Sequence, residues 1–238
     1  MISSYIQIIL QLITDLEQSQ AEAIQRAAVV VADAIAQGKL IYTFGSGHSQ
    51  LIAREVAYRA GGLASIVHLP DSSWGLNERV EGVGKSIFAQ FPVKAGDVIF
   101  VISNSGRNPE PIEVALAAKQ KNLSVIAITS LQHSKSVTSR HSSHKKLFEI
   151  ADIVLDNCAP PGDATMQLDA FPEKIGPVST ALSIILIQAI IVAAIQLLVD
   201  RGFVPPVLIS ANLDGSDQHN QEILERYPQL SWVNQYSV

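Results

Sequence analysis

Two short stretches rich in serine and glycine carry the side chains best suited to bind an anion. They read GSGHS (Gly45–Ser49) and SNSGRNPEP (Ser103–Pro111). Serine hydroxyls and backbone N–H groups donate to phosphate oxygens, and glycine lets the backbone approach closely. Because one hydrogen bond to a charged group contributes about 1.5–3 kcal/mol, three or four can fix a phosphate without a lysine, and Arg107 could add a charge. The alternative is that both stretches are tight turns with serine caps.

Other nucleotide and metal chemistries fit the sequence poorly. GVGKS (Gly82–Ser86) lacks the first glycine of a P-loop, since Arg79 occupies that position. GSGHSQ has Gln50 where the dinucleotide fingerprint needs its third glycine. His141 and His144 lie three residues apart, without acidic or cysteine partners at a metal-ligand spacing. We therefore expect no cofactor and no bound metal.

Five short apolar runs predict the strands that position the two serine loops: Leu40–Phe44, Ser65–Leu69, Asp97–Ser103, Ser124–Thr129 and Asp152–Asp156. Helical spacing predicts helices over about 24–38, 49–60, 76–88 and 109–121. Strands that alternate with helices indicate a parallel sheet covered on both faces. With the common strand order 2-1-3-4-5, both loops flank one crevice at the carboxyl ends of their strands. Residues 157–178 carry few regular signals and are expected to form a long connection.

The composition indicates a soluble protein with small-molecule ligands. The net charge is −5, and no run of like charges suggests a nucleic-acid surface. The single cysteine, Cys158, cannot form an internal disulfide, so we expect a cytoplasmic location. Ala181–Val199 has nineteen residues without a charge, near the length of a membrane span. Because Ser183, Gln188 and Gln196 interrupt it, we expect no membrane and a helix buried in a core or a subunit interface.

Three longer runs of the sequence resemble the SIS (sugar isomerase) domain. They read AIQRAAVVVADAIAQGKLIYTFGSGHS, SNSGRNPEPIEVALAAKQKNLSVIAITS and GPVSTALS, and the similarity spans about residues 22–212. The sequence is most similar to phosphoheptose isomerases and to single-domain SIS proteins. The resemblance implies a three-layer α/β fold with a flavodoxin-like five-stranded parallel sheet, assembled as a homodimer or homotetramer. We expect an N-terminal helix over 1–20, an SIS domain over 21–212 and a C-terminal tail over 213–238.

The resemblance also implies contacts for individual residues. Those expected to touch a sugar are Ser46, Gly47 and Ser49, and those expected to hold its phosphate are Ser103, Asn104, Ser105, Gly106 and Asn108. Ser179 and Thr180 match a further loop that faces the ligand. Phosphoheptose isomerases carry a histidine and a glutamate on the helix after the first motif. This sequence has Glu55 and Arg59 there, so that pair is absent.

Isomerisation of an aldose to a ketose requires a base that moves a proton between adjacent carbons. Glu81 is the first candidate, because related SIS enzymes place a catalytic glutamate in this stretch; the alternative is a solvated helix face. Glu55 could serve if a neighbouring subunit closes over it, or could form a structural salt bridge. His219 could act as acid or base from the tail, or be an exposed loop histidine, and Asp71 could bind a sugar hydroxyl. We predict a sugar-phosphate isomerase, with a non-catalytic sugar-phosphate sensor or an amino-sugar-phosphate etherase or lyase as alternatives.

Overall fold

A single parallel sheet lies at the centre of the structure, a computed structural model that describes residues 2–227. Its strands are β1 (Ile41–Gly45), β2 (Ile66–Leu69), β3 (Val98–Ile102), β4 (Ser124–Thr129) and β5 (Ile153–Asp156). Their spatial order is β2-β1-β3-β4-β5, and every neighbouring pair is parallel. The predicted flavodoxin-like sheet and its strand order are thereby confirmed.

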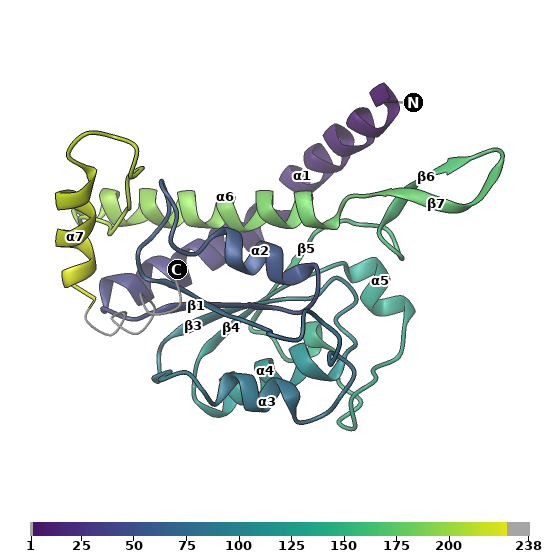
Figure 1. Ribbon diagram of the computed structural model, residues 1–238, viewed down its shortest axis with the longest axis horizontal. Helices are drawn as coiled ribbons and strands as arrows, with labels where there is room; N and C mark the ends of the chain where they lie inside the picture. The colour runs from purple at the N-terminus through teal and green to yellow at the C-terminus, as the bar shows by residue number, and fades with distance from the viewer. Residues whose placement is uncertain (1, 228–238) are drawn as a thin grey trace.

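Helices cover both faces of the sheet, as Figure 1 shows. On one face lie α1 (Ile2–Ala36), α2 (Ser49–Glu55) and α6 (Ser179–Asp200), and on the other lie α3 (Val83–Phe88) and α4 (Pro109–Gln120). After β4 come α5 (Leu131–Ser136) and a 3-10 turn (Leu147–Glu149). The last described helix, α7 (Ser216–Glu225), lies beside the carboxyl end of α6. The predicted three-layer α/β architecture is confirmed.

The central strand β3 shows why the sheet needs both helical layers. Val98, Phe100 and Ile102 belong to the apolar cluster formed with α1 and α6, while Ile99 and Val101 belong to the cluster formed with α4. Successive side chains of a strand point to opposite faces, so this alternation places apolar groups on both sides. All five are buried. A strand covered on both faces reads as a continuous apolar run, which made β3 the clearest strand in the sequence.

The helix expected over 76–88 is wrong in its first half. The chain runs through turns until Gly82, whose φ of 93° is left-handed, and α3 starts at Val83. The helix expected over 49–60 also ends early, at Glu55, and Tyr58 takes a φ of 52°. The turns before α3 place Trp74, Gly75 and Glu78 beside the serine loops.

The connection expected over 157–178 contains a β-hairpin that the sequence did not predict. Its strands are β6 (Ala164–Leu168) and β7 (Phe171–Pro177), paired antiparallel with an irregularity between Met166 and Leu168. Figure 1 shows the hairpin extending away from the sheet beside α1 and the start of α6. The Tyr5 hydroxyl of α1 donates to the Pro177 carbonyl oxygen at 2.6 Å. The hairpin is therefore attached to α1 at its base.

Two further helices bear on the expected boundaries. α1 runs without a break through residue 20 as one helix of 35 residues. The tail expected over 213–238 contains α7, and its part beyond residue 227 lies outside the described residues. α6 is long and apolar enough to span a membrane, yet buried residues such as Leu186, Ile190 and Ala194 pack in the core with α1. That packing is typical of a core helix in a globular domain.

Candidate functional site

Nine of the eleven predicted binding residues line one cavity of about 610 Å³. They are Ser46, Gly47, Ser49, Ser103, Asn104, Ser105, Asn108, Ser179 and Thr180. The cavity lies where β1 and β3 end, and these strands are neighbours in the sheet. Ligands of open α/β sheets bind beyond the carboxyl ends of the strands. Three segments distant in sequence therefore bring their hydroxyl groups to the expected edge.

The two sides of the cavity are joined by a close approach of two glycines. Gly47 belongs to the first serine loop, and Gly75 belongs to the turns that precede α3. A Cβ added at Gly75, where φ is 83°, would lie 2.8 Å from the Gly47 Cα. Only glycine fits this approach, which brings Trp74, Gly75 and Glu78 into the cavity wall.

Buried carboxyl groups surround the Ser46 hydroxyl. The Ser46 Oγ lies 2.9 Å from Oε2 of Glu110 and 3.3 Å from Oδ2 of Asp71. Asp71 is held in place because its carboxylate also accepts from the backbone N–H and hydroxyl of Ser73 and from the Gly75 N–H. Burial, with a smaller contribution from nearby carboxylates, raises the pKa of Glu110 to about 7. Sequence reasoning considered Asp71 but missed Glu110, whose carboxyl meets Ser46 and Asp71 from loops distant in sequence.

Hydrogen bonds from Asn157 and Asp163 fix other polar groups of the cavity wall. Asn157 donates through Nδ2 to Oδ1 of Asn104 at 3.1 Å and to the Ser183 hydroxyl at 3.0 Å. The Asp163 carboxylate accepts from the Ser179 N–H at 2.7 Å and from the Ser179 hydroxyl at 2.8 Å. These contacts reduce the rotamer freedom of groups that a ligand would meet, which favours binding.

Four titratable side chains line the cavity: His48, Glu78, His133 and Asp163. Glu78 and His133 both line the cavity, and neither was predicted. Burial, with the nearby Arg107 guanidinium, lowers the pKa of His133, so its imidazole is neutral at pH 7. The buried Nδ1 of His133 has no hydrogen-bond partner among the described residues. A signal existed for neither residue, because one lay in an expected helix and the other in a polar loop.

The predicted acid–base residues do not line this cavity. Glu81 is exposed, and its carboxylate accepts from the Ser142 N–H and hydroxyl, which lower its pKa. Glu55, the last residue of α2, forms a half-exposed ion pair with Arg59. His219 lies on α7, with Nε2 3.1 Å from the Val207 carbonyl oxygen. Glu81 lies in a turn and not on the helix face that its alternative named, whereas Glu55 forms the ion pair that its alternative named.

Two predicted phosphate residues also lie outside the cavity wall. Gly106 is buried, with a φ of 57°, and a Cβ there would lie 2.7 Å from the Ser134 hydroxyl. Arg107 donates through Nε to the Thr138 carbonyl oxygen at 2.9 Å. Gly106 therefore shapes the loop. Within residues 2–227, no group of three histidine, cysteine, aspartate or glutamate side chains is arranged to hold a metal ion.

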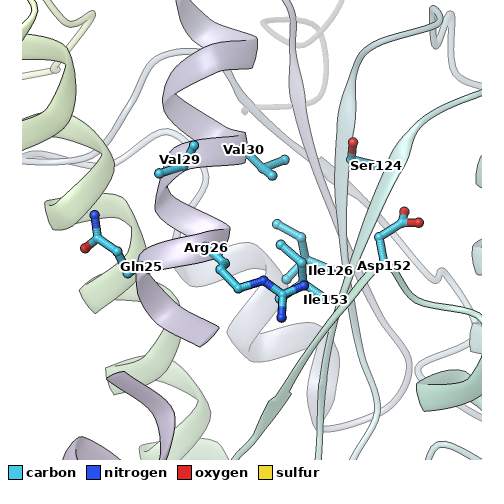
Figure 2. A pocket seen from close by; sticks show the side chains of 8 residues that line it. All are labelled: Gln25, Arg26, Val29, Val30, Ser124, Ile126, Asp152 and Ile153. Carbon is cyan, nitrogen blue, oxygen red and sulfur yellow. The ribbon is translucent and has the colours of Figure 1, made fainter. Parts of the chain in front are cut away.

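A second cavity of about 440 Å³ lies at the other end of the sheet, between α1 and the β4–β5 edge (Figure 2). Its lining consists of Gln25, Arg26, Val29, Val30, Ser124, Ile126, Asp152 and Ile153. Ser124 and Ile153 are the first residues of their strands, so this cavity is at the amino ends. Its walls are mainly apolar, and it contains none of the predicted site residues. The serine cavity is therefore the candidate site.

Solved structures support the fold independently. A phosphoheptose isomerase from Neisseria gonorrhoeae matches with a TM-score of 0.59 at 20% identity, covering 82% of this chain and 97% of that chain. A phosphoheptose isomerase from Francisella tularensis matches with a TM-score of 0.59 at 16% identity, covering 82% and 96%. The Vibrio vulnificus NanR protein complexed with ManNAc-6P matches with a TM-score of 0.52 at 16% identity, covering 94% and 69%. At these identities the likeness establishes the fold.

Sequence relatives are considerably closer. A UPF0309 protein from Halalkalibacterium halodurans is 43% identical over 227 residues, which cover 91% of this chain and 93% of the relative. One from Shouchella clausii is 40% identical over 236 residues, covering 95% and 96%. The profile of the SIS domain matches residues 4–130, more than half of the chain. Together with the sheet order and the serine loops at its carboxyl edge, these matches identify the chain as a member of the SIS domain family, related along nearly its whole length to UPF0309 proteins.

Proposed function

We propose that the serine cavity binds a sugar phosphate and that the protein is a sugar-phosphate aldose–ketose isomerase. One observation carries the binding proposal: five serines, Ser46, Ser49, Ser103, Ser105 and Ser179, line one cavity. Two longer helices, α4 and α6, also begin there, at Pro109 and Ser179. The Glu110 N–H donates to the Glu78 carbonyl oxygen and the Ser179 N–H donates to Asp163, so these helices favour a phosphate through their positive dipole ends.

The sugar would extend from the phosphate toward Ser46, Glu78 and His133. An aldose–ketose isomerase needs one base, which takes the proton from the carbon beside the carbonyl and returns it to the former carbonyl carbon. The hydroxyl proton moves in the opposite sense, so composition is unchanged. We assign Glu78 as the base and neutral His133 as the group that polarises the carbonyl, because both line the cavity. The sequence-based alternative, Glu81, is exposed and bonded to Ser142.

A thermal-shift screen tests the binding proposal. The full chain is heated with a panel of sugar phosphates, each beside its unphosphorylated sugar. A ligand at 100 times its Kd should stabilise the fold by about 2.7 kcal/mol. We expect a raised melting temperature with phosphorylated members only. Ser105→Ala should weaken the effective ligand by about 1–3 kcal/mol, whereas Ser86→Ala, an exposed serine on α3, should leave it unchanged. No shift with any member would contradict the proposal.

Turnover of the ligand that binds then decides between enzyme and sensor. We expect Glu78→Gln to reduce isomerisation by at least a hundredfold, in the range of general-base catalysis, with little change in ligand affinity. Glu81→Gln tests the sequence-based assignment in the same assay. If Glu81→Gln abolishes turnover and Glu78→Gln does not, Glu81 is the base. Binding without turnover in the unmodified protein would favour the non-catalytic sensor, the alternative consistent with the absence of the histidine–glutamate pair of phosphoheptose isomerases. We retain the expectations of a cytoplasmic homo-oligomer as part of this proposal.

A further inference from the structure

The Ser46 hydroxyl contacts two carboxyl groups, although it has only one hydrogen to donate. Glu110 Oε2 lies 2.9 Å and Asp71 Oδ2 3.3 Å from Ser46 Oγ. If both carboxyls were ionised, one contact would join two acceptors at hydrogen-bond distance without a proton between them. One additional proton resolves this conflict, because a protonated carboxyl can donate to the hydroxyl oxygen while the hydroxyl donates elsewhere.

The surroundings identify Glu110 as the group that carries this proton. Its side chain is fully buried (0% exposed), and its Oε1 has no hydrogen-bond partner among the described residues. Asp71, by contrast, accepts three hydrogen bonds from Ser73 and Gly75, which favour its ionised form. The charged groups that act on Glu110 are Asp71, Glu78 and Glu113, all carboxylates, and they disfavour a further negative charge.

The protonation state of Glu110 decides what Ser46 offers to the cavity. With Glu110 protonated, Oε2–H donates to Ser46 Oγ, and the Ser46 hydrogen is free to turn from Asp71 to a ligand oxygen. With Glu110 ionised, its carboxylate accepts the Ser46 hydrogen in a stronger, charge-assisted bond. Ser46 then presents only lone pairs to the cavity that it lines.

We propose that Glu110, Ser46 and Asp71 share one proton and that Glu110 is a positioning residue, which keeps the Ser46 hydroxyl available as a donor to an acceptor oxygen of the bound ligand. The ligand half of this proposal rests on the proposed sugar-phosphate function, whereas the shared proton does not. It follows that ligands presenting a carbonyl or anionic oxygen at Ser46 bind best while Glu110 is protonated, and that their affinity falls as the pH rises through neutrality.

The first test needs no ligand. In the full chain labelled with ¹³C at the glutamate carboxyl carbons, the signal that disappears in Glu110→Gln is followed from pH 4 to 9. We expect a midpoint near 7. A midpoint near 4.5, the ordinary value for glutamate, would overturn the shared proton regardless of what the cavity binds.

The second test measures the Kd of fructose 6-phosphate and glucose 6-phosphate at pH 6 and pH 8.5. Titration of the ligand's phosphate affects the Kd of the wild type and of each variant equally, so it cancels when their Kd values are divided. We expect the wild-type affinity to fall about tenfold more than that of Glu110→Gln, since one charge-assisted bond is lost and the glutamine N–H still donates to Ser46. Glu173→Gln, the control at an exposed glutamate of β7, should follow the wild type.

Equal pH dependence of wild type and Glu110→Gln would overturn the role of Glu110 toward the ligand. If neither sugar phosphate binds to the wild type or to any variant at either pH, the proposed sugar-phosphate function and the role of Glu110 toward the ligand are both wrong. The carboxyl titration would then still decide the shared proton, so the failures of the two proposals are distinguishable.

Discussion

A single buried carboxyl, Glu110, should make the stability of the fold depend on pH. Its pKa is raised from 4.5 to about 7 by burial, so the folded state binds its proton more tightly than the unfolded state. The stabilisation is fully present below pH 4.5 and is lost as the pH rises to about 7. The shift corresponds to about 3 kcal/mol. Between pH 5 and 8, the unfolding free energy measured in urea should therefore fall by up to this amount more in the wild type than in Glu110→Gln. Parallel stability profiles would contradict it.

The residues of the site differ in how far sequence could predict them. Ser46, Ser103 and Ser105 could be predicted because their loops follow strongly apolar strands, and the edge of a parallel sheet brings such loops together. Glu110 could not, because the groups beside its carboxyl, Ser46 and Asp71, come from the loops after β1 and β2, which are distant in sequence. Burial by a distant element leaves no local pattern in sequence.

At the scale of elements, the close approach of the two loops around the cavity depends on Gly75. Alanine there adds a Cβ 2.8 Å from the Gly47 Cα, at a φ of 83°. Gly82→Ala is the matched control, since its φ is 93° but nothing lies within 4 Å of an added Cβ. We expect Gly82→Ala to cost about 1 kcal/mol of unfolding free energy, from backbone strain alone, and Gly75→Ala about 3 kcal/mol, because overpacking adds 1–3 kcal/mol. Equal losses in urea unfolding would show that the loops adjust freely.

The element that sequence missed also contributes to the site. The β6–β7 hairpin could not be predicted because β7 reads FPEKIGP, without the alternating β-branched residues typical of a strand. At its start, Asp163 accepts hydrogen bonds from the Val178 and Ser179 N–H groups, at 3.0 and 2.7 Å. Asp163 thus fixes the first turn of α6, where Ser179 and Thr180 meet the cavity.

Asp163→Ala should therefore loosen the start of α6. Removing the acceptor leaves two backbone N–H groups and the Ser179 hydroxyl without this partner, and losing such a cap costs about 0.5–2 kcal/mol. Hydrogen exchange should increase at residues 178–181 and stay unchanged in the middle of α6. Asp169→Ala, at the exposed hairpin tip, is the control. Unchanged exchange at the start of α6 would mean that helix packing alone holds it.

At the scale of the whole molecule, α1 carries more apolar surface than this chain covers. Tyr5, Ile9 and Leu12 pack against the core, whereas Ile6 and Leu10 are 52% and 57% exposed. The latter two are four residues apart, so they share one face of the helix. Figure 1 shows this half of α1 extending beyond the sheet. A second copy of the chain is the occupant that the expected homodimer or homotetramer supplies.

Light scattering on the purified chain checks this assembly. We expect a mass of at least two chains for the wild type, and a shift toward the 25.6 kDa monomer for the double variant Ile6→Lys with Leu10→Lys. Association would remove the two lysine ammonium groups from water without a partner charge, and the free-energy cost of this desolvation opposes dimer formation. Val204→Lys, at an apolar residue 72% exposed in the loop after α6, should leave the mass unchanged. A monomeric wild type would contradict the assembly. A double variant that keeps the wild-type mass would instead exclude this face of α1, so that the contact must be sought elsewhere on the molecule.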